Sequence, residues 1–122
     1  MRYLTQDDPI QSPRATELIE RRLSEQNPGF VSVVAMVETA WVLERAYQMN
    51  DAAIAAAIER TLQADVLVVE DEPQVFAALT MLREGRGGFA DALIGALGER
   101  AGCSYTATFD RKAVRLPGFV PP

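Results

Sequence analysis

Residues 85–113 read GRGGFADALIGALGERAGCSYTATFDRKA. This stretch predicts a glycine loop, then a helix, then a strand, and the interpretation of the rest of the chain depends on it. The helix begins where the glycine loop ends, and Asp91 lies near its start. A short apolar strand comes next, and Asp110 follows that strand directly. The two carboxylates therefore lie at the ends of two different elements, where a ligand can reach them.

The remaining sequence alternates helices with short apolar strands. Ser12, Ser32 and Asn50 are residue types that cap helix N-termini, and each precedes apolar residues at helical spacing. The run VLVV at residues 66–69 is typical of a buried strand. This alternation predicts one α/β domain over residues 1–122, with a short and mostly parallel sheet. Helices are expected at residues 12–23, 32–49, 52–62 and from Pro73 onward, and strands at residues 30–31, 66–69 and 104–109.

Two of the expected helices carry packing patterns. The helix from Pro73 onward has a stripe of apolar residues that we expect to face inward. Gly95 and Gly98 keep the helix after the glycine loop slim, so that it can pack closely on the sheet. The expected inward stripe consists of Val75, Phe76, Leu79 and Leu82.

The amino-acid composition limits the kinds of catalytic and metal-binding site that the chain can form. The 122 residues are 48% apolar and 24% charged, which is ordinary for one soluble domain, and no apolar run or leader suggests a membrane span or secretion. The single cysteine, Cys103, excludes an internal disulfide and fits the cytoplasm. Without histidine, Ser-His-Asp and Cys-His catalysis are impossible, and so is an ordinary zinc site. Carboxylates are the remaining candidate catalytic groups, and as metal ligands they suit a hard cation such as Mg²⁺ or Mn²⁺.

The net charge of −5 and the sequence pI near 4.7 bear on the partners of the chain. They exclude a broad basic surface that coats nucleic acid, because such binding needs many lysines and arginines. A local basic rim around an acidic site is compatible with this charge. So is a partner that carries positive charge.

Glu38 is a third candidate carboxylate. It lies inside the helix expected at residues 32–49, where its neighbours at three and four residues are all apolar. We expect that face to be buried, and a buried carboxylate needs a partner. Either Glu38 is a ligand-binding residue or it forms an ion pair, for which Arg45 is the candidate.

Asp91 and Asp110 each have a structural alternative. An acid in the first turn of a helix is stabilised by free N–H groups, so Asp91 alone is more simply a capping residue. The glycine loop before it favours a ligand site, since the backbone there can approach a phosphate closely. Asp110 is either a turn residue or a ligand at the carboxyl end of a strand.

Other polar residues accompany these acids. Thr108 points to the same side of the strand as Asp110 and is positioned to support it. Four basic side chains could line a site for a phosphate-bearing substrate, although each alone is more simply a solvated charge. These basic residues are Arg86, Arg111, Lys112 and Arg115.

Four stretches, in order, resemble a PIN domain of the VapC-type toxin ribonucleases. They read RYLTQDDP, FVSVVAMVETAWVLERAY, GFADALIGALGERAGC and TATFDRKAVRLPGF, and together they span nearly the whole chain. The resemblance implies a three-layer α/β/α domain that cleaves RNA phosphodiester bonds with Mg²⁺ or Mn²⁺. It also implies that Glu38, Asp91 and Asp110 are metal ligands, with Thr108 beside the last of them.

The resemblance carries further expectations about partners. Proteins of this family are usually homodimers, each neutralised by a small antitoxin whose basic C-terminal segment lies across the acidic site. The chain departs from the family at its start, because a first apolar strand with the first metal-binding aspartate should precede Arg2. We therefore expect weak nuclease activity and reduced stability from the chain as written.

Two alternatives stand beside the ribonuclease. One is a non-catalytic binding module that keeps dimerisation and antitoxin capture without cleavage. The other is an unrelated small α/β domain in which all the acids are structural.

Overall fold

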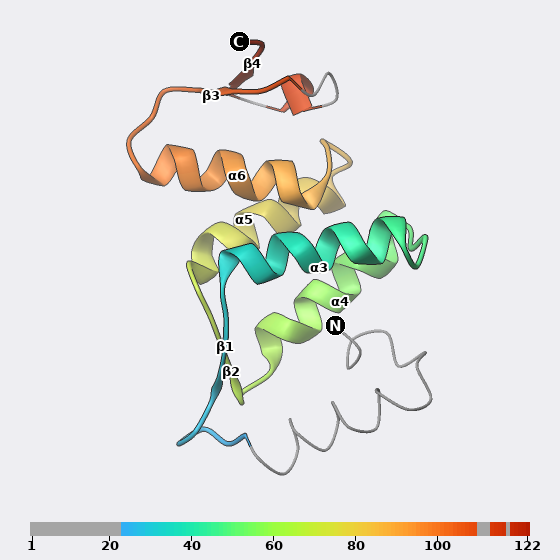
Figure 1. Ribbon diagram of the computed structural model, residues 1–122, viewed down its shortest axis with the longest axis vertical. Helices are drawn as coiled ribbons and strands as arrows, with labels where there is room; N and C mark the ends of the chain where they lie inside the picture. Colours follow the sequence, from blue (N-terminus) through green and yellow to red (C-terminus); the bar gives the residue numbers. More distant parts are fainter. Residues whose placement is uncertain (1–22, 110–112, 117) are drawn as a thin grey trace.

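The computed structural model describes residues 23–109, 113–116 and 118–122, and in it a pair of helices follows each of the first two described strands (Figure 1). The helix predicted at residues 12–23 lies outside the described residues, apart from Leu23. The elements in order are β1 (Gly29–Val31), α3 (Val33–Arg45), α4 (Asp51–Gln63), β2 (Leu67–Val69), α5 (Glu72–Arg83), α6 (Phe89–Arg100), β3 (Thr106–Ala107), the 3₁₀ helix η2 (Ala113–Arg115) and β4 (Phe119–Val120).

Both described capping predictions are confirmed. The Ser32 side chain accepts a hydrogen bond from the Ala35 N–H at 3.0 Å, and Asn50 accepts one from the Ala53 N–H at 2.9 Å. These bonds satisfy backbone donors that have no partner within their own helix. The helix α3 ends at Arg45, earlier than predicted, and Gln48 then adopts a φ of 52°, which a continuing helix does not allow.

The strands pair in parallel, as the sequence predicts, but in two separate pairs within the described residues. In the first pair Phe30 is level with Val68. In the second, Thr106 is level with Phe119. Figure 1 shows the β1–β2 pair and the β3–β4 pair on opposite sides of the helices α3, α5 and α6. The mixed α/β class is confirmed, and the further strand expected ahead of Arg2 stays a prediction.

The hydrophobic core lies among the four helices and draws on both strand pairs. From the stripe predicted on α5, Val75, Leu79 and Leu82 are buried, whereas Phe76 is 46% exposed. Phe76 directly follows Val75, a turn of about 100° around the helix, and so it points away from the core. No helix in the described part of the chain is long and apolar enough to span a membrane.

The helix α6 packs tightly against β4. A Cβ atom at Gly95 would lie only 2.5 Å from the Phe119 ring, and one at Gly98 would lie 3.1 Å from the Thr106 hydroxyl oxygen. The prediction that these glycines permit close packing is therefore confirmed. The contact at Gly95 is the closer of the two. The Phe119 ring is buried, so it has little room to move away.

Replacing Gly95 with alanine should destabilise the domain. Alanine gains about 1 kcal/mol of helix propensity, but the overpacking against Phe119 should cost about 1–3 kcal/mol. Gly98→Ala is the matched control, because its neighbour is a hydroxyl that can move. Urea denaturation should give a lower free energy of unfolding for Gly95→Ala than for Gly98→Ala, and equal values would contradict this packing.

Candidate functional site

The helix that carries Glu38 is fixed at its N-terminus by a residue distant in sequence. Glu70 directly follows β2, and its Oε1 atom accepts a hydrogen bond from the Val33 N–H at 2.9 Å. The Glu70 N–H in turn donates to the Val31 carbonyl at 2.9 Å. A carboxylate at a helix N-terminus is stabilised by free N–H groups and the helix dipole. The end of β2 therefore sets the position of α3.

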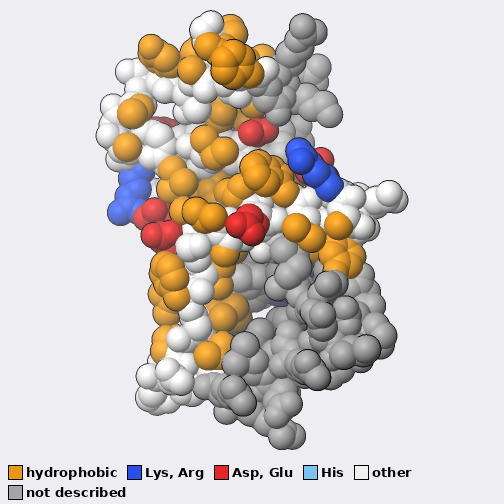
Figure 2. All heavy atoms as spheres, in the orientation of Figure 1, with side chains coloured by type: hydrophobic (Ala, Val, Ile, Leu, Met, Phe, Trp, Pro, Cys, Tyr) orange, Lys and Arg blue, Asp and Glu red, His pale blue; other side chains and the backbone are white. Residues whose placement is uncertain are grey.

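Glu38 lies on the outer side of α3, so the expectation of a buried face is wrong. Its apolar neighbours Val34 and Trp41 are 64% and 44% exposed, and Glu38 itself is exposed. Figure 2 shows apolar side chains over the face of the molecule that carries α3, with acidic groups among them. The core side of the helix is formed by other residues: Met36, Ala40 and Leu43.

Arg45 does not form the ion pair with Glu38 that the sequence allowed. Its guanidinium carbon lies 5.6 Å from the centre of the Trp41 ring, a distance typical of a cation–π contact. Among the salt bridges between described residues, none involves Glu38. The Glu38–Arg45 ion pair that the sequence allowed is thus absent, and Glu38 is exposed.

Asp91 is placed where the sequence predicts, in the first turn of α6. It is half-buried and lines a small cavity of about 50 Å³ together with Trp41, Glu44 and Asp51. Sequence reasoning missed Glu44 and Asp51 as neighbours of Asp91. Both are exposed charges at helix ends, and only the packing of α3 and α4 beside α6 brings them near it.

The glycine loop before α6 adopts backbone conformations that glycine favours. Gly85 has a φ of 71° and Gly87 a φ of 154°, which side chains other than glycine rarely adopt. Arg86 lies between them, is exposed, and has its Nε atom 3.4 Å from a carboxylate oxygen of Glu84. This ion pair of Arg86 lies at the surface, and a phosphate can replace it at little cost.

Thr108 continues the pairing of β3 with β4, since its N–H donates to the Val120 carbonyl at 2.9 Å. Its side chain is half-buried. Asp110, Arg111 and Lys112 lie outside the described residues, as does the side chain of Arg115. Their predicted roles stay predictions.

The donor chemistry of the candidate acids fits a divalent ion, since oxygen-only ligand sets suit Mg²⁺ and Mn²⁺. Glu38 does not line the cavity beside Asp91. Within residues 23–109 and the short segments after the gap, no three acidic, histidine or cysteine side chains gather closely enough to hold one metal ion.

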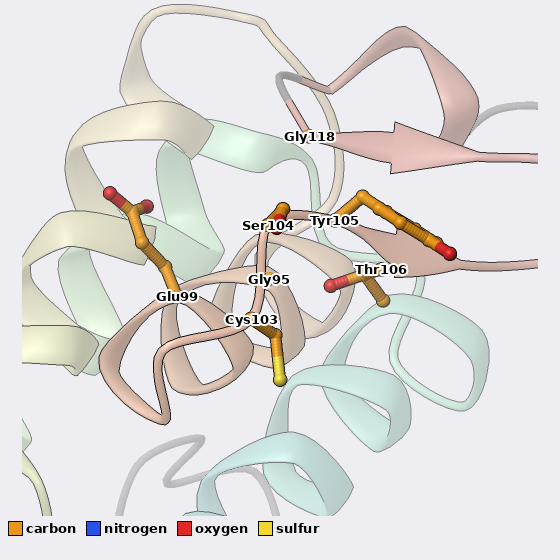
Figure 3. Close-up of a pocket in the computed structure, with 7 residues that line it drawn as sticks. All are labelled: Gly95, Glu99, Cys103, Ser104, Tyr105, Thr106 and Gly118. Carbon is orange, nitrogen blue, oxygen red and sulfur yellow. The ribbon is translucent and has the colours of Figure 1, made fainter.

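A second cavity, of about 420 Å³, lies between the end of α6 and β3 (Figure 3). Glu99 is the only carboxylate among the described residues that line it, and the free thiol of Cys103 is exposed there. Of the predicted site residues that the structure describes, none lines this cavity.

Comparison with known proteins identifies the family. The family model described as PIN domain matches residues 3–118, which is nearly the whole chain. The chain therefore belongs to the PIN domain family, whose members are generally metal-dependent nucleases. This membership excludes the alternative of an unrelated α/β domain. No curated protein and no solved structure matches the chain.

The anchoring of α3 by Glu70 can be tested by substitution. Glu70→Ala removes the acceptor for the Val33 N–H and should lower the free energy of unfolding by about 1 kcal/mol. Glu70→Gln keeps an acceptor oxygen, so its free energy of unfolding should fall by less than that of Glu70→Ala. Urea denaturation of both variants measures this order, and an equal loss in the two would show that the hydrogen bond contributes nothing.

Proposed function

We propose that the protein is a metal-dependent endoribonuclease and the toxin of a toxin–antitoxin pair, hydrolysing RNA phosphodiester bonds. The observation that carries the proposal is the PIN domain match over residues 3–118. The position of Asp91 supports it, because a carboxylate in the first turn of α6, beside a cavity with further acids, suits a cation site. The family commonly binds RNA and forms toxin–antitoxin complexes.

In this proposal Glu38, Asp91 and Asp110 hold Mg²⁺ or Mn²⁺. A divalent ion bound there would supply Lewis-acid chemistry, polarising the phosphodiester and lowering the pKa of water. The three carboxylates would hold the ion, and Thr108 would support Asp110 by hydrogen bonding. The half-buried position of Asp91 limits its motion, which favours a fixed ligand geometry.

Arg86 is proposed to bind a phosphate of the RNA. It is exposed on a loop whose shape is set by Gly85 and Gly87, and its ion pair with Glu84 is at the surface. A guanidinium binds phosphate with two parallel hydrogen bonds, so it fixes the orientation of the substrate backbone. In this proposal Arg86 binds the substrate and takes no part in the hydrolytic step.

The proposed partners are an RNA substrate, a second copy of the chain and a cognate antitoxin. A net charge of −5 suits an antitoxin with a basic segment, since opposite charges speed and strengthen association. The same charge means that RNA binding relies on the metal ion and on local basic groups.

A non-catalytic binding module is the second candidate. It is favoured by one observation, that no three metal-binding side chains meet in the described part of the chain. Titration calorimetry with Mn²⁺ separates the two candidates. Heat of binding that is reduced in Asp91→Asn supports the nuclease, whereas no binding by the parent protein supports the module.

Asp91→Asn should reduce RNA cleavage by about 100-fold or more, since even residues that only support metal ligands typically cost about 10–100-fold. The amide keeps the size of the side chain but loses the charge that binds the ion. Cleavage of a fluorescent RNA in Mg²⁺ or Mn²⁺, with a chelator as blank, measures it. Asp65→Asn, at an exposed loop position, is the matched control. Unchanged cleavage by Asp91→Asn would refute the proposed metal site.

Arg86→Ala should raise KM for RNA by about two- to fivefold, because one exposed charge contact contributes about that much to binding. The variant should leave kcat unchanged. The reason is that Arg86 contacts a phosphate and no group of the hydrolytic step. Steady-state kinetics over a range of RNA concentrations measures both constants. Arg60→Ala on α4 is the control, and a fall in kcat with constant KM would contradict the binding role.

A further inference from the structure

Trp41, the single tryptophan of the chain, lies on α3 beside two of the acids proposed to bind the metal ion. It follows Glu38 by three residues, so the two side chains lie about one turn apart on the same face of the helix. It also lines the cavity of about 50 Å³ beside Asp91, together with Glu44 and Asp51. The indole ring therefore adjoins the candidate metal site.

Trp41 is unusually accessible for a tryptophan. The residue is 44% exposed, whereas tryptophan is highly buried on average. The cavity that it lines is too small to enclose a nucleobase. A ligand of that size must lie over the exposed part of the ring, where the broad aromatic face of the indole can stack on another planar ring.

The charges around the indole favour an uncharged ligand. Four acidic side chains adjoin the ring, and they repel a phosphate group from it. A nucleobase carries no net charge, and its N–H groups can donate hydrogen bonds to carboxylates at its edge. The surroundings of Trp41 therefore favour the base of a nucleotide over its phosphate. The four acids are Glu38, Glu44, Asp51 and Asp91.

Arg45 supplies positive charge on the same helix. Its guanidinium carbon lies 5.6 Å from the centre of the Trp41 ring, and no salt bridge between described residues engages it. A cation–π contact at an exposed site is weak. The guanidinium can therefore turn to a phosphate while the ring holds the neighbouring base.

We propose that Trp41 is the stacking platform for an unpaired base of the RNA substrate, and that Arg45 binds a phosphate of the same strand. Bases inside a duplex are already stacked and paired, so the bound segment is a single strand or a loop. This inference deepens the proposed function and rests on it for the identity of the ligand as RNA. Trp41 binds the substrate and takes no part in hydrolysis.

The fluorescence of Trp41 tests the proposal directly, because no other tryptophan contributes to the signal. Oligouridylate is titrated into the full chain in Ca²⁺, which binds oxygen ligands and offsets the charge of the acids. A gel verifies that the RNA stays intact. The single strand should quench the emission in a saturable way, and the same strand annealed to oligoadenylate should quench it much less. Absent quenching by the single strand, or equal quenching by the duplex, would overturn the proposal.

Substitutions of Trp41 separate aromatic stacking from simple apolar contact. Fluorescence anisotropy of dye-labelled oligouridylate measures the affinity of each variant. Trp41→Ala should bind about fivefold more weakly or worse, the usual effect of losing one stacked base. Trp41→Phe keeps an aromatic face and should retain most of the affinity, whereas Trp41→Leu should bind as weakly as Trp41→Ala. Equal affinities of the Phe and Leu variants would contradict stacking.

Tyr105→Ala is the matched control for removing an exposed aromatic ring. Tyr105 is 63% exposed and lines the separate cavity between α6 and β3, so its removal should leave the affinity for oligouridylate unchanged. Circular dichroism melts verify that every variant is folded. A loss of affinity in Tyr105→Ala as large as that in Trp41→Ala would show that the effect is not specific to Trp41.

The role of Arg45 has its own measurement. Arg45→Gln should reduce the slope of log Kd against log salt concentration by about 0.7, the contribution of one phosphate contact to a single strand. It should leave the quenching of Trp41 at saturation unchanged. An unchanged slope would overturn the assignment of a phosphate to Arg45.

Failure of this inference and failure of the proposed function give different results. Cleavage of RNA in Mg²⁺ or Mn²⁺ without quenching of Trp41 overturns the stacking platform and leaves the nuclease. Quenching without cleavage overturns the nuclease and leaves a site that binds single-stranded RNA. Without RNA, the emission of Trp41 should not depend on protein concentration, and a shift on dilution would show that a second copy of the chain covers the ring instead.

Discussion

The close approach of α6 to β4 is the constraint on which the candidate site depends. The Phe119 ring occupies the space that a side chain at Gly95 would need, so the helix and the strand pair are held at short distance. Asp91 lies one turn before Gly95 on the same helix. Asp91 is half-buried beside α3 and α4 because α6 also packs against α3 and α5, on the side away from β4, so the helix is held between the strand pair and the other helices (Figure 1).

Local sequence signals predicted the elements well. Ser32 and Asn50 cap helices as their residue types indicate, since a capping bond needs only nearby backbone donors. The run at residues 66–69 forms β2 as predicted, but of its residues only Val69 is buried and Val68 is 51% exposed, so the expectation of a buried strand is only partly confirmed. The strand expected at residues 104–109 is limited to Thr106–Ala107, because its partner β4 is itself only Phe119–Val120.

Side-chain environment was harder to predict than secondary structure. Glu38 and Phe76 were expected to face inward, and both face solvent. Apolar neighbours at helical spacing indicate an apolar face, but α3 has apolar residues around most of its circumference. Only the packing of neighbouring helices decides which of these faces is buried. For the same reason Glu44 and Asp51 were missed as neighbours of Asp91.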